Sequence, residues 1–364
     1  MKSKLSIKKK IIYSLFFYII FILFLTIILE IIFGSWIKKK DEWSSTERLN
    51  VIRNKKIEFK VDKLYNYKKK YITYTRDHFG LRGQCDSIKD IEIITLGGST
   101  TDQRYINDGE TWQDILQEKL SKKFNKRICI SNAGVDGHST FAHLESLKIW
   151  FPLIKELKPK IYILYIGIND AFFTFSPRPN YDINYDDNLL DKIKKKSAIY
   201  NLLKNFYYSV NKNRLTTHKK IKRNDITFSE ILINNKTPEI SEMNSLLFVE
   251  RLKEIIKIIK NTNSKLICIS QPHLYIDHAL NRGFSNFYEY EKINFNSLDF
   301  HYSLIEINKK MEYLCQENAG TYYIDLTSKK FENSDFYDLG HNTPSGAEKI
   351  GLIIYEEFIN KNIY

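Results

Sequence analysis

The feature of this sequence that most constrains its fold is a repeated order of an apolar run, a short polar segment and a helical pattern. Four polar segments directly follow a strand-like run, and a fifth lies a little beyond one. These segments are residues 96–101, 131–137, 166–170, 270–272 and 338–341. In an open parallel sheet the carboxyl ends of the strands share one edge, where such folds bind ligands. The order therefore predicts one site at one edge of a sheet.

The apolar runs predict five strands, with amphipathic helices between them. The strands are expected at residues 91–96, 127–131, 161–166, 265–270 and 321–324. Apolar side chains recur at helical spacing over residues 112–120, 144–157, 246–259 and 347–354. Strands that alternate with helices predict an α/β fold, in which a parallel sheet is covered on both faces.

The basic composition does not indicate a nucleic-acid partner. The 364-residue chain has a net charge of +13, but lysine supplies most of the positive charge, and neither an arginine cluster nor a known nucleic-acid-binding module is present. Abundant Ile, Asn, Tyr and Lys are typical of an AT-rich genome, and we attribute much of the charge to that bias. An anionic membrane surface or an acidic glycan fits the lysine-rich stretches better.

Residues 11–33 form a predominantly apolar stretch near the N-terminus, without a charge from 11 to 29. About 20 apolar residues span a bilayer, whereas the apolar region of a signal peptide is roughly 7–15 residues long and ends at small residues. This stretch ends in bulky side chains, so we predict an uncleaved single-pass anchor in the cell membrane rather than a signal peptide or a buried helix. Five lysines precede it and three follow it, which favours a cytoplasmic N-terminus and an extracytoplasmic catalytic domain.

We divide the chain into an N-terminal tail and anchor (1–36), a juxtamembrane connector (37–85) and a core domain (86–364). No strong core strand is evident from about 171 to 240. We interpret this interval, which contains prolines, an acidic stretch at 181–187 and a basic stretch at 192–222, as an insertion beside the active edge. A lid, a substrate-binding surface, a contact with lipid head groups and a solvated decoration all remain open.

The cysteines do not predict a metal site. The four cysteines lie at positions 85, 129, 268 and 315, and no pair shows metal-ligand spacing. Cys129 and Cys268 fall within predicted strands, where a buried thiol acts as a small apolar side chain. We expect no disulfide framework, although a single bridge is left open.

The first polar segment offers a nucleophile. Ser99 follows a strand and two glycines, Gly97 and Gly98, which permit a tight turn. It also precedes a helix, where backbone N–H groups favour negative charge. A helix N-cap would use the same residues, and so would a phosphate loop, although no lysine follows as in a Walker motif.

Two other segments offer hydrogen-bond donors. The backbone N–H of Gly137 and the side-chain amide of Asn169 could bind an oxyanion together with the N–H of Ser99. Gly134 and Gly137 are equally compatible with ordinary turns, and Asn169 is compatible with capping the next turn. Asp170 is expected to accept hydrogen bonds from nearby backbone N–H groups.

Asp338 and His341 form a candidate acid–base pair near the C-terminus. His341 could take the proton of Ser99 while Asp338 fixes the tautomer of the imidazole. A serine, two donors and an Asp–His pair at one sheet edge meet the requirements for acyl transfer. The remaining histidines are expected to be structural or exposed, and His273 is the exception to watch because it follows a strand end. They are His78, His138, His143, His218, His273, His278 and His301.

Together these blocks resemble the SGNH hydrolase superfamily of GDSL-like esterases and lipases. The four signature residues of that family match Ser99, Gly137, Asn169 and His341, and the Asp that precedes the family's His matches Asp338. The similarity covers roughly residues 72–170 and 264–364. Residues 73–83 are similar to a segment found in membrane-anchored bacterial members. The resemblance implies a three-layer α/β/α, flavodoxin-like fold around a five-stranded parallel sheet, with no metal and no organic cofactor.

The sequence departs from the family at Gly98, which replaces the Asp of the family's Gly-Asp-Ser and removes a carboxylate that would help to order the loop. The resemblance implies esterase, deacetylase or acyltransferase chemistry on glycans or lipids. We therefore predict a membrane-anchored serine esterase that hydrolyses O-acyl esters, for example O-acetyl esters, on an envelope glycan or related surface molecule. An O-acyltransferase with the same triad and a non-catalytic surface-binding protein with the same fold are the alternatives.

Overall fold

The computed structural model describes most of the chain, in two compact units. One unit comprises Met1–Glu42 with Tyr185–Arg214, and the other comprises Trp43–Asn184 with Leu215–Tyr364. The described residues are 7–36, 42–171, 189–210, 218, 220, 228–232, 234–274, 276–277, 282–284, 288–290 and 293–364. The acidic stretch at 181–187 and the lysines at positions 2, 4 and 38–40 lie outside them.

This grouping differs in two places from the three segments expected from the sequence. The larger unit already begins at Trp43, inside the expected connector, and Tyr185–Arg214 groups with the N-terminal helix rather than with the core domain. The connector also contains regular structure, because β1 (Lys55–Lys60) and β2 (Tyr71–Arg76) pair as an antiparallel hairpin. Apolar side chains of the hairpin form a small core of their own with Tyr105 and Tyr337.

The larger unit is built around a five-stranded parallel sheet, which confirms the predicted fold class. The strand order is β12-β7-β5-β3-β4. The chain adds β4 on one side of β3 and then β5, β7 and β12 on the other side, so the order switches direction between β3 and β5, and ligands bind at such switch points. The strands are β3 (Ile91–Gly97), β4 (Cys129–Asn132), β5 (Ile161–Tyr165), β7 (Lys265–Ile269) and β12 (Thr321–Ile324).

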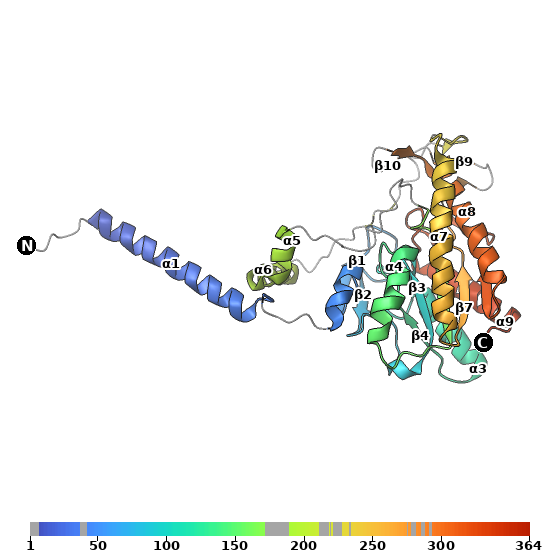
Figure 1. Cartoon of the computed structure of the whole chain (residues 1–364), viewed down its shortest axis with the longest axis horizontal. Coiled ribbons are helices and arrows are strands. Elements are labelled where there is room, and N and C mark those ends of the chain that lie inside the picture. Colours follow the sequence, from blue (N-terminus) through green and yellow to red (C-terminus); the bar gives the residue numbers. More distant parts are fainter. Residues whose placement is uncertain are drawn as a thin grey trace, which may run out of the picture. The chain divides into compact units, whose positions relative to one another are not determined.

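Helices cover both faces of the sheet, so the unit has three layers (Figure 1). Alternate side chains of each strand enter different clusters: Leu164 of β5 packs into the cluster that contains α4, α7 and α8, whereas Ile163 packs into the cluster that contains α3 and α9. Most strand side chains on both faces are apolar and buried, as expected for a parallel sheet that lies between two layers of helices. The helices are α3 (Trp112–Phe124), α4 (Thr140–Glu145), α7 (Thr237–Lys260), α8 (Ser297–Gln316) and α9 (Pro344–Asn360).

The helices differ from the sequence-based expectations at two points. The helix expected over 144–157 is shorter, because α4 ends at Glu145 and continues as one π turn (Ser146–Trp150) and one 3-10 turn (Phe151–Leu153) that contains Pro152. Helix α8 was not predicted, although its buried apolar residues recur at helical spacing.

Shorter elements complete the larger unit: η1 (Glu42–Leu49), η2 (Ile88–Asp90), α2 (Ser99–Asp102), β6 (Phe228–Ser229), β8 (Ile276–Asp277), β9 (Arg282–Phe284), β10 (Tyr288–Tyr290), β11 (Ile293–Phe295) and η6 (Asn333–Asp335).

The expectation about cysteines is wrong. Cys85 is bonded to Cys129, and Cys268 is bonded to Cys315. Cys129 and Cys268 do lie in β4 and β7, as predicted. One disulfide, however, links β4 to the loop that contains Cys85, and the other links β7 to α8. The partners are 44 and 47 residues apart in the sequence, and only the folded chain brings them together.

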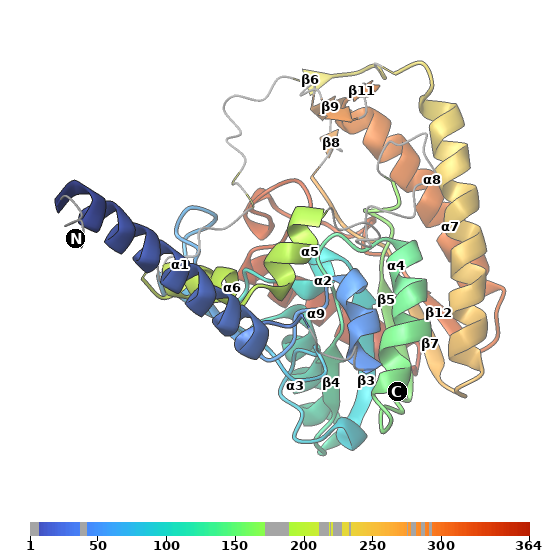
Figure 2. The same cartoon turned by 60° about the vertical axis from the view of Figure 1, so that its left-hand side comes forward.

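The smaller unit contains the N-terminal helix and two helices of the insertion. They are α1 (Ile7–Phe33), α5 (Leu189–Lys196) and α6 (Ala198–Val210). Within the described residues, the stretch Lys9–Phe33 is the one helix long and apolar enough to cross a bilayer, and its side chains are not buried by the protein. Helix α6 lies beside the carboxyl end of α1 in both views (Figures 1 and 2).

Candidate active site

The structure brings Ser99 and His341 together, although 242 positions separate them in the sequence. The Oγ atom of Ser99 lies 2.7 Å from Nε2 of His341, and Nδ1 of the same ring lies 2.7 Å from Oδ2 of Asp338. All three groups are partly buried. The hydroxyl, the imidazole and the carboxylate thus form one continuous hydrogen-bonded chain, which is the arrangement that activates a serine.

The turn that presents Ser99 depends on two glycines. Helix α2 begins at Ser99 immediately after β3, so the N–H of Ser99 is one of the first-turn amides that have no acceptor inside the helix. At Gly97 a Cβ atom would overlap the carbonyl oxygen of Tyr165 and the side chain of Thr101. The turn can pass this close to β5 only because no side chain is present, and the hydroxyl is therefore held at the end of the sheet.

The loop before α9 positions the imidazole. Oδ1 of Asp338 accepts hydrogen bonds from the backbone N–H groups of Gly340 and His341, at 2.9 and 2.7 Å. Burial opposes ionisation of Asp338, but the hydrogen bond and the charge of His341, together with these two amides, outweigh it and hold the pKa of Asp338 below its usual value. The carboxylate is therefore kept ionised beside the ring.

The two predicted donors lie in the loops after β4 and β5. Gly137 has a φ of 84°, a backbone conformation that favours glycine. The Nδ2 atom of Asn169 donates to the carbonyl oxygen of His138 at 2.8 Å, which leaves the second amide proton for another acceptor. Asn169 also lies against Gly98, because a Cβ atom at Gly98 would be 2.5 Å from that Nδ2. The side chain of Asn169 is thus placed next to the Ser99 turn.

Two neighbouring residues support these loops. Asp170 accepts hydrogen bonds from the N–H of Thr140, at 3.1 Å, and from its hydroxyl, which confirms its expected role as an acceptor at the start of α4. In the segment 270–272, Oε1 of Gln271 accepts from the N–H of Ile168 at 2.7 Å, and its amide donates to Thr100 of α2. Gln271 therefore links the loop after β5 to the helix that carries Ser99.

A buried charge cluster lies below the Ser99 turn. Asp102 of α2 is 1% exposed and is paired with Arg76 of β2. The hydroxyl of Tyr74 donates to the same carboxylate at 2.9 Å, and Nη1 of Arg76 donates to the carbonyl oxygen of Asn132 at 2.9 Å. The β1–β2 hairpin therefore contacts both α2 and the end of β4 and holds them together. The segment 73–83, which the family resemblance singled out, thus has a structural role here.

One histidine that we expected to be structural or exposed lies at the site. The ring of His218 is 4.2 Å from the ring of His341, centre to centre, and its Nδ1 is 2.9 Å from the hydroxyl of Tyr337. Tyr337 in turn stacks on His341 at 5.7 Å. Burial, followed by the charge of His341, lowers the pKa of His218 to about 4. No sequence signal places His218 here, because it comes from the insertion rather than from the end of a strand.

His218, Asp338 and His341 also hold potential metal-ligand atoms within 4.8 Å of one another. Both ring nitrogens of His341 already contact Asp338 and Ser99. A metal ion bound through His341 would therefore have to displace one of these two contacts.

Among the remaining histidines, His78 is exposed, as expected, and two pairs are found elsewhere. His273 is buried, and its Nε2 lies 3.3 Å from Nδ1 of His301 on α8, whereas His278 lies outside the described residues. His138 and His143 are buried near the start of α4, and Nε2 of His138 lies 2.7 Å from the carbonyl oxygen of Leu49. The ring that contacts Ser99 is that of His341.

The two buried histidines make the stability of the fold sensitive to acid. Burial, opposed in part by the hydrogen bond to Leu49, lowers the pKa of His138 to about 4, and burial followed by the charge of His138 holds that of His143 well below 6.5. Both folded-state values lie below the unfolded value of about 6.5. The stabilisation is therefore complete above pH 6.5 and is lost as the pH falls toward 4, by about 3 kcal/mol for His138 alone.

This loss can be measured as the free energy of unfolding in denaturant at pH 7.5 and pH 4.5. His138→Gln is the matched control, because glutamine keeps a donor for Leu49 but has no ring to titrate. The variant should be less sensitive to acid than the wild-type chain. Equal sensitivity in both proteins would show that His138 does not enter the folded state as a neutral ring.

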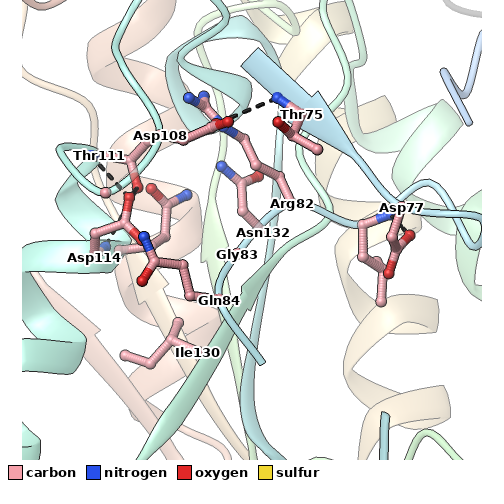
Figure 3. A pocket seen from close by; sticks show the side chains of 13 residues that line it. Thr75, Asp77, Arg82, Gly83, Gln84, Asp108, Thr111, Asp114, Ile130 and Asn132 are labelled. Atoms are coloured by element: carbon pink, nitrogen blue, oxygen red, sulfur yellow. Dashed lines mark hydrogen bonds and ion pairs between the residues drawn. The ribbon is translucent and has the colours of Figure 1, made fainter. Parts of the chain in front are cut away.

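The pocket drawn in Figure 3 lies apart from Ser99 and is not part of the candidate site. It has a volume of about 310 Å³ and includes Arg82, Asp108, Asp114 and Asp77 in its wall, but no residue of the Ser–His–Asp chain. Its carboxylates serve the fold: Asp108 pairs with Arg82 at 2.9 Å, Asp114 caps α3, and Asp77 accepts two backbone N–H groups of its own loop. We assign no ligand to this pocket.

Comparison with models of protein families identifies the family of this chain. The model of the GDSL-like lipase/acylhydrolase family matches residues 95–349, which include all five predicted site residues. The chain belongs to this family. It is therefore an ester-hydrolysing enzyme of the SGNH type. No curated protein sequence matches the chain.

Several solved structures are similar to the chain, at low sequence identity. They include an acetyl xylan esterase (15% identity, TM-score 0.38, 73% of this chain and 99% of that one). A GDSL-like lipase from Bacteroides thetaiotaomicron VPI-5482 has 10% identity and a TM-score of 0.37, covering 76% and 91%. A mutant of an acetyl-xylooligosaccharide esterase from Geobacillus Stearmophilus has 10% identity and a TM-score of 0.39, covering 74% and 92%. Because each TM-score is below 0.5, these structures carry no argument about the activity of this chain.

The departure from the family's Gly-Asp-Ser leads to a prediction about activity. A Cβ atom at Gly98 would be 2.5 Å from Nδ2 of Asn169 and 3.0 Å from the carbonyl oxygen of His138. Gly98→Ala should therefore displace the Asn169 amide. If this amide stabilises the oxyanion, turnover of an aryl ester should fall by ~10²–10³, the usual effect of losing one such donor.

A double-mutant cycle separates this effect from general damage to the turn. In the background of Asn169→Ala, Gly98→Ala should cause little further loss, because the amide that it would displace is already gone. Fully additive losses would contradict the proposed contact between Gly98 and Asn169.

Proposed function

We propose that this protein is a membrane-anchored serine esterase that removes short O-acyl groups, such as acetyl, from an envelope glycan or a related surface molecule. The observation that carries the proposal is the hydrogen-bonded chain from Ser99 through His341 to Asp338. These residues come from the start and the end of the larger unit, and their meeting at the carboxyl edge of the sheet is difficult to explain by packing alone.

In the proposed reaction, the Oγ of Ser99 attacks the ester carbonyl while Nε2 of His341 takes its proton. Asp338 stabilises the imidazolium through Nδ1. The N–H groups of Ser99 and Gly137 and the second amide proton of Asn169 bind the tetrahedral oxyanion. His341 then protonates the departing alcohol, leaving an acyl group on Ser99. A water molecule that His341 deprotonates attacks this acyl-enzyme and releases the free acid. No metal and no organic cofactor is required.

Three features of the chain support the proposed location of the substrate. Helix α1 is long and apolar enough to cross a bilayer. The two disulfides are of the kind that persists in oxidising compartments and is rare in the cytosol. With the lysine bias around the span, they support a catalytic unit outside the cytoplasm, where the available esters are those of envelope glycans and lipids.

The proposal is tested with the full chain reconstituted in lipid nanodiscs. Aryl esters of increasing acyl length and an O-acetylated glycan are supplied, and the released acid is quantified. We expect the acetyl ester and the acetylated glycan to be cleaved. Cleavage restricted to long acyl chains would contradict the preference for short groups.

The same reaction distinguishes the O-acyltransferase alternative. With an acyl donor and a non-acylated glycan present together, an esterase releases free acid, whereas a transferase yields acylated sugar. An inert reconstituted protein, with no reaction of Ser99 toward a fluorophosphonate, would instead favour a surface-binding protein that keeps the fold.

A further inference from the structure

The helices of the insertion carry an exposed apolar face. α5 and α6 are separated only by Ser197. Large apolar side chains are exposed along both helices, from 41% at Ile193 to 74% at Leu189. The members of this apolar face are Leu189, Leu190, Ile193, Leu202, Leu203 and Phe206. Soluble proteins rarely expose a large continuous apolar patch, and such patches mark sites of contact with another protein or with a membrane.

The apolar residues lie on one side of each helix. In α6, the spacing of Leu202, Leu203 and Phe206 places them on one face, whereas Asn201 and Lys204 fall on the opposite face. In α5, the same spacing places Leu189, Leu190 and Ile193 on one face and Asp191 on the opposite face. Both helices are therefore amphipathic, with an apolar side and a charged or polar side, as in helices that lie in a membrane interface.

A carboxylate of the anchor helix holds this pair in place. Glu30 lies near the carboxyl end of α1, and its side chain accepts hydrogen bonds from the N–H groups of Ala198 and Ile199, at 2.9 and 3.1 Å, and from the hydroxyl of Ser197 at 2.6 Å. It thereby caps the first turn of α6, where free backbone N–H groups favour a negative charge. This contact explains the single charged residue of the stretch 11–33.

Two further contacts strengthen the junction at the same end of α1. The N–H of Ser35 donates to the carbonyl oxygen of Lys196 at 2.9 Å, and the indole N–H of Trp36 donates to Glu30 at 2.8 Å. Tryptophan is enriched where a spanning helix leaves the hydrocarbon core. We therefore expect the interface between the acyl chains and the head groups to lie at the depth of Glu30, Trp36 and the start of α6.

We propose that α5 and α6 form a second membrane contact, in which their apolar face is inserted among the lipids at the carboxyl end of α1. Charge complementarity identifies anionic phospholipid as the partner, because the exposed lysines of the pair, Lys194, Lys196 and Lys204, would lie at head-group level. The inference rests on the proposed membrane anchor, since α1 determines which surface the pair meets.

The closing experiment uses single introduced cysteines in the full chain. All four native cysteines are in disulfides, so an added thiol can be labelled selectively. Phe206→Cys carries an environment-sensitive fluorophore on the apolar face, and Lys204→Cys carries it on the opposite face of the same helix as the matched control. Each protein is reconstituted in vesicles of phosphatidylcholine with phosphatidylglycerol, and quenching by nitroxide-labelled lipid is compared with quenching by aqueous iodide.

We expect the label at position 206 to be quenched by the nitroxide lipid and shielded from iodide, and the label at 204 to show the reverse. Omitting phosphatidylglycerol should weaken the lipid quenching at 206. Quenching of both labels by iodide alone would overturn the proposal. Shielding of position 206 from both quenchers would also overturn it, because protein, such as a second copy of the chain, would then cover the face.

Alkaline extraction of the same vesicles separates the proposal from its premise. If the chain is extracted, α1 is not an anchor and the proposed membrane location fails. If the chain is retained while position 206 remains open to iodide, the anchor stands and only the second membrane contact is wrong. Leu203→Glu provides a second variant: it leaves Glu30 and Ser197 in place, and it should reduce lipid quenching at 206 without releasing the chain.

Discussion

Ser99→Ala should abolish ester hydrolysis. In the structure the hydroxyl of Ser99 is the group that meets Nε2 of His341, at 2.7 Å. Alanine cannot form an acyl-enzyme, and only binding and the oxyanion donors would remain. Loss of the serine from the subtilisin triad lowers turnover by on the order of 10⁶, and we expect a loss of that size here. The measurement is the rate of aryl acetate hydrolysis by the reconstituted full chain.

The matched control is Ser270→Ala. Ser270 also follows a strand of the same sheet, but its hydroxyl contacts Asp325 at 2.7 Å instead of His341. This variant should retain most of the activity of the wild-type chain once its folded fraction is taken into account. Full activity of Ser99→Ala would disprove the nucleophile, and equal losses in the two variants would indicate general damage rather than chemistry.

Asp338→Asn should lower turnover by about 10⁴, the loss found when the aspartate of a serine-protease triad is replaced by asparagine. Asparagine can present an N–H to Nδ1 of His341 where Asp338 now presents an oxygen at 2.7 Å. The ring would then keep its proton on Nε2, facing Ser99, and could no longer accept the serine proton. The rate of aryl acetate hydrolysis measures the loss.

The thermal stability of Asp338→Asn serves as the control for damage to its fold. The remaining carbonyl oxygen of Asn can still accept from the backbone N–H groups of Gly340 and His341, which Oδ1 of Asp338 does now. The midpoint of thermal unfolding should therefore change little. A large loss of activity together with an unchanged melting temperature supports a role in orienting the imidazole, whereas wild-type activity would remove Asp338 from the proposed triad.

The central sheet could be predicted from sequence because its physical signature is local. Strand β5, for example, is a short apolar run whose two faces are both buried, and it is followed by residues that end the run. The positions of Ser99 and Asn169 follow from the same rule, since the carboxyl ends of parallel strands meet at one edge. His341 could be included because its Asp–x–x–His spacing lies a little beyond the last strand.

The features that were not predicted depend on contacts distant in sequence. The β1–β2 hairpin has buried positions that alternate along β2, but lysines and polar residues fill the exposed ones, so the segment shows no apolar run. The partners of Cys129 and Cys268 lie on a loop and on α8, which no spacing rule connects to the strands. His218 reaches His341 from the insertion, where the order of strands and helices gives no guide.

The same limit applies to the insertion. Its amphipathic helices could have been recognised from their periodicity, but their grouping with α1 could not. That grouping involves contacts distant in sequence, such as the one between Glu30 and Ser197, which are 167 residues apart. From sequence alone an acid near the end of an apolar span indicates only where the span stops being apolar.

The most direct measurement is the site of covalent labelling by a fluorophosphonate, located by tandem mass spectrometry in the reconstituted full chain. A serine reacts readily with this reagent only when a base is positioned to take its proton. We predict a single adduct on Ser99, formed by the wild-type chain and lost or strongly slowed in His341→Ala. An adduct on a different serine, or labelling of Ser99 at the same rate without His341, would contradict the proposed pairing of these two residues.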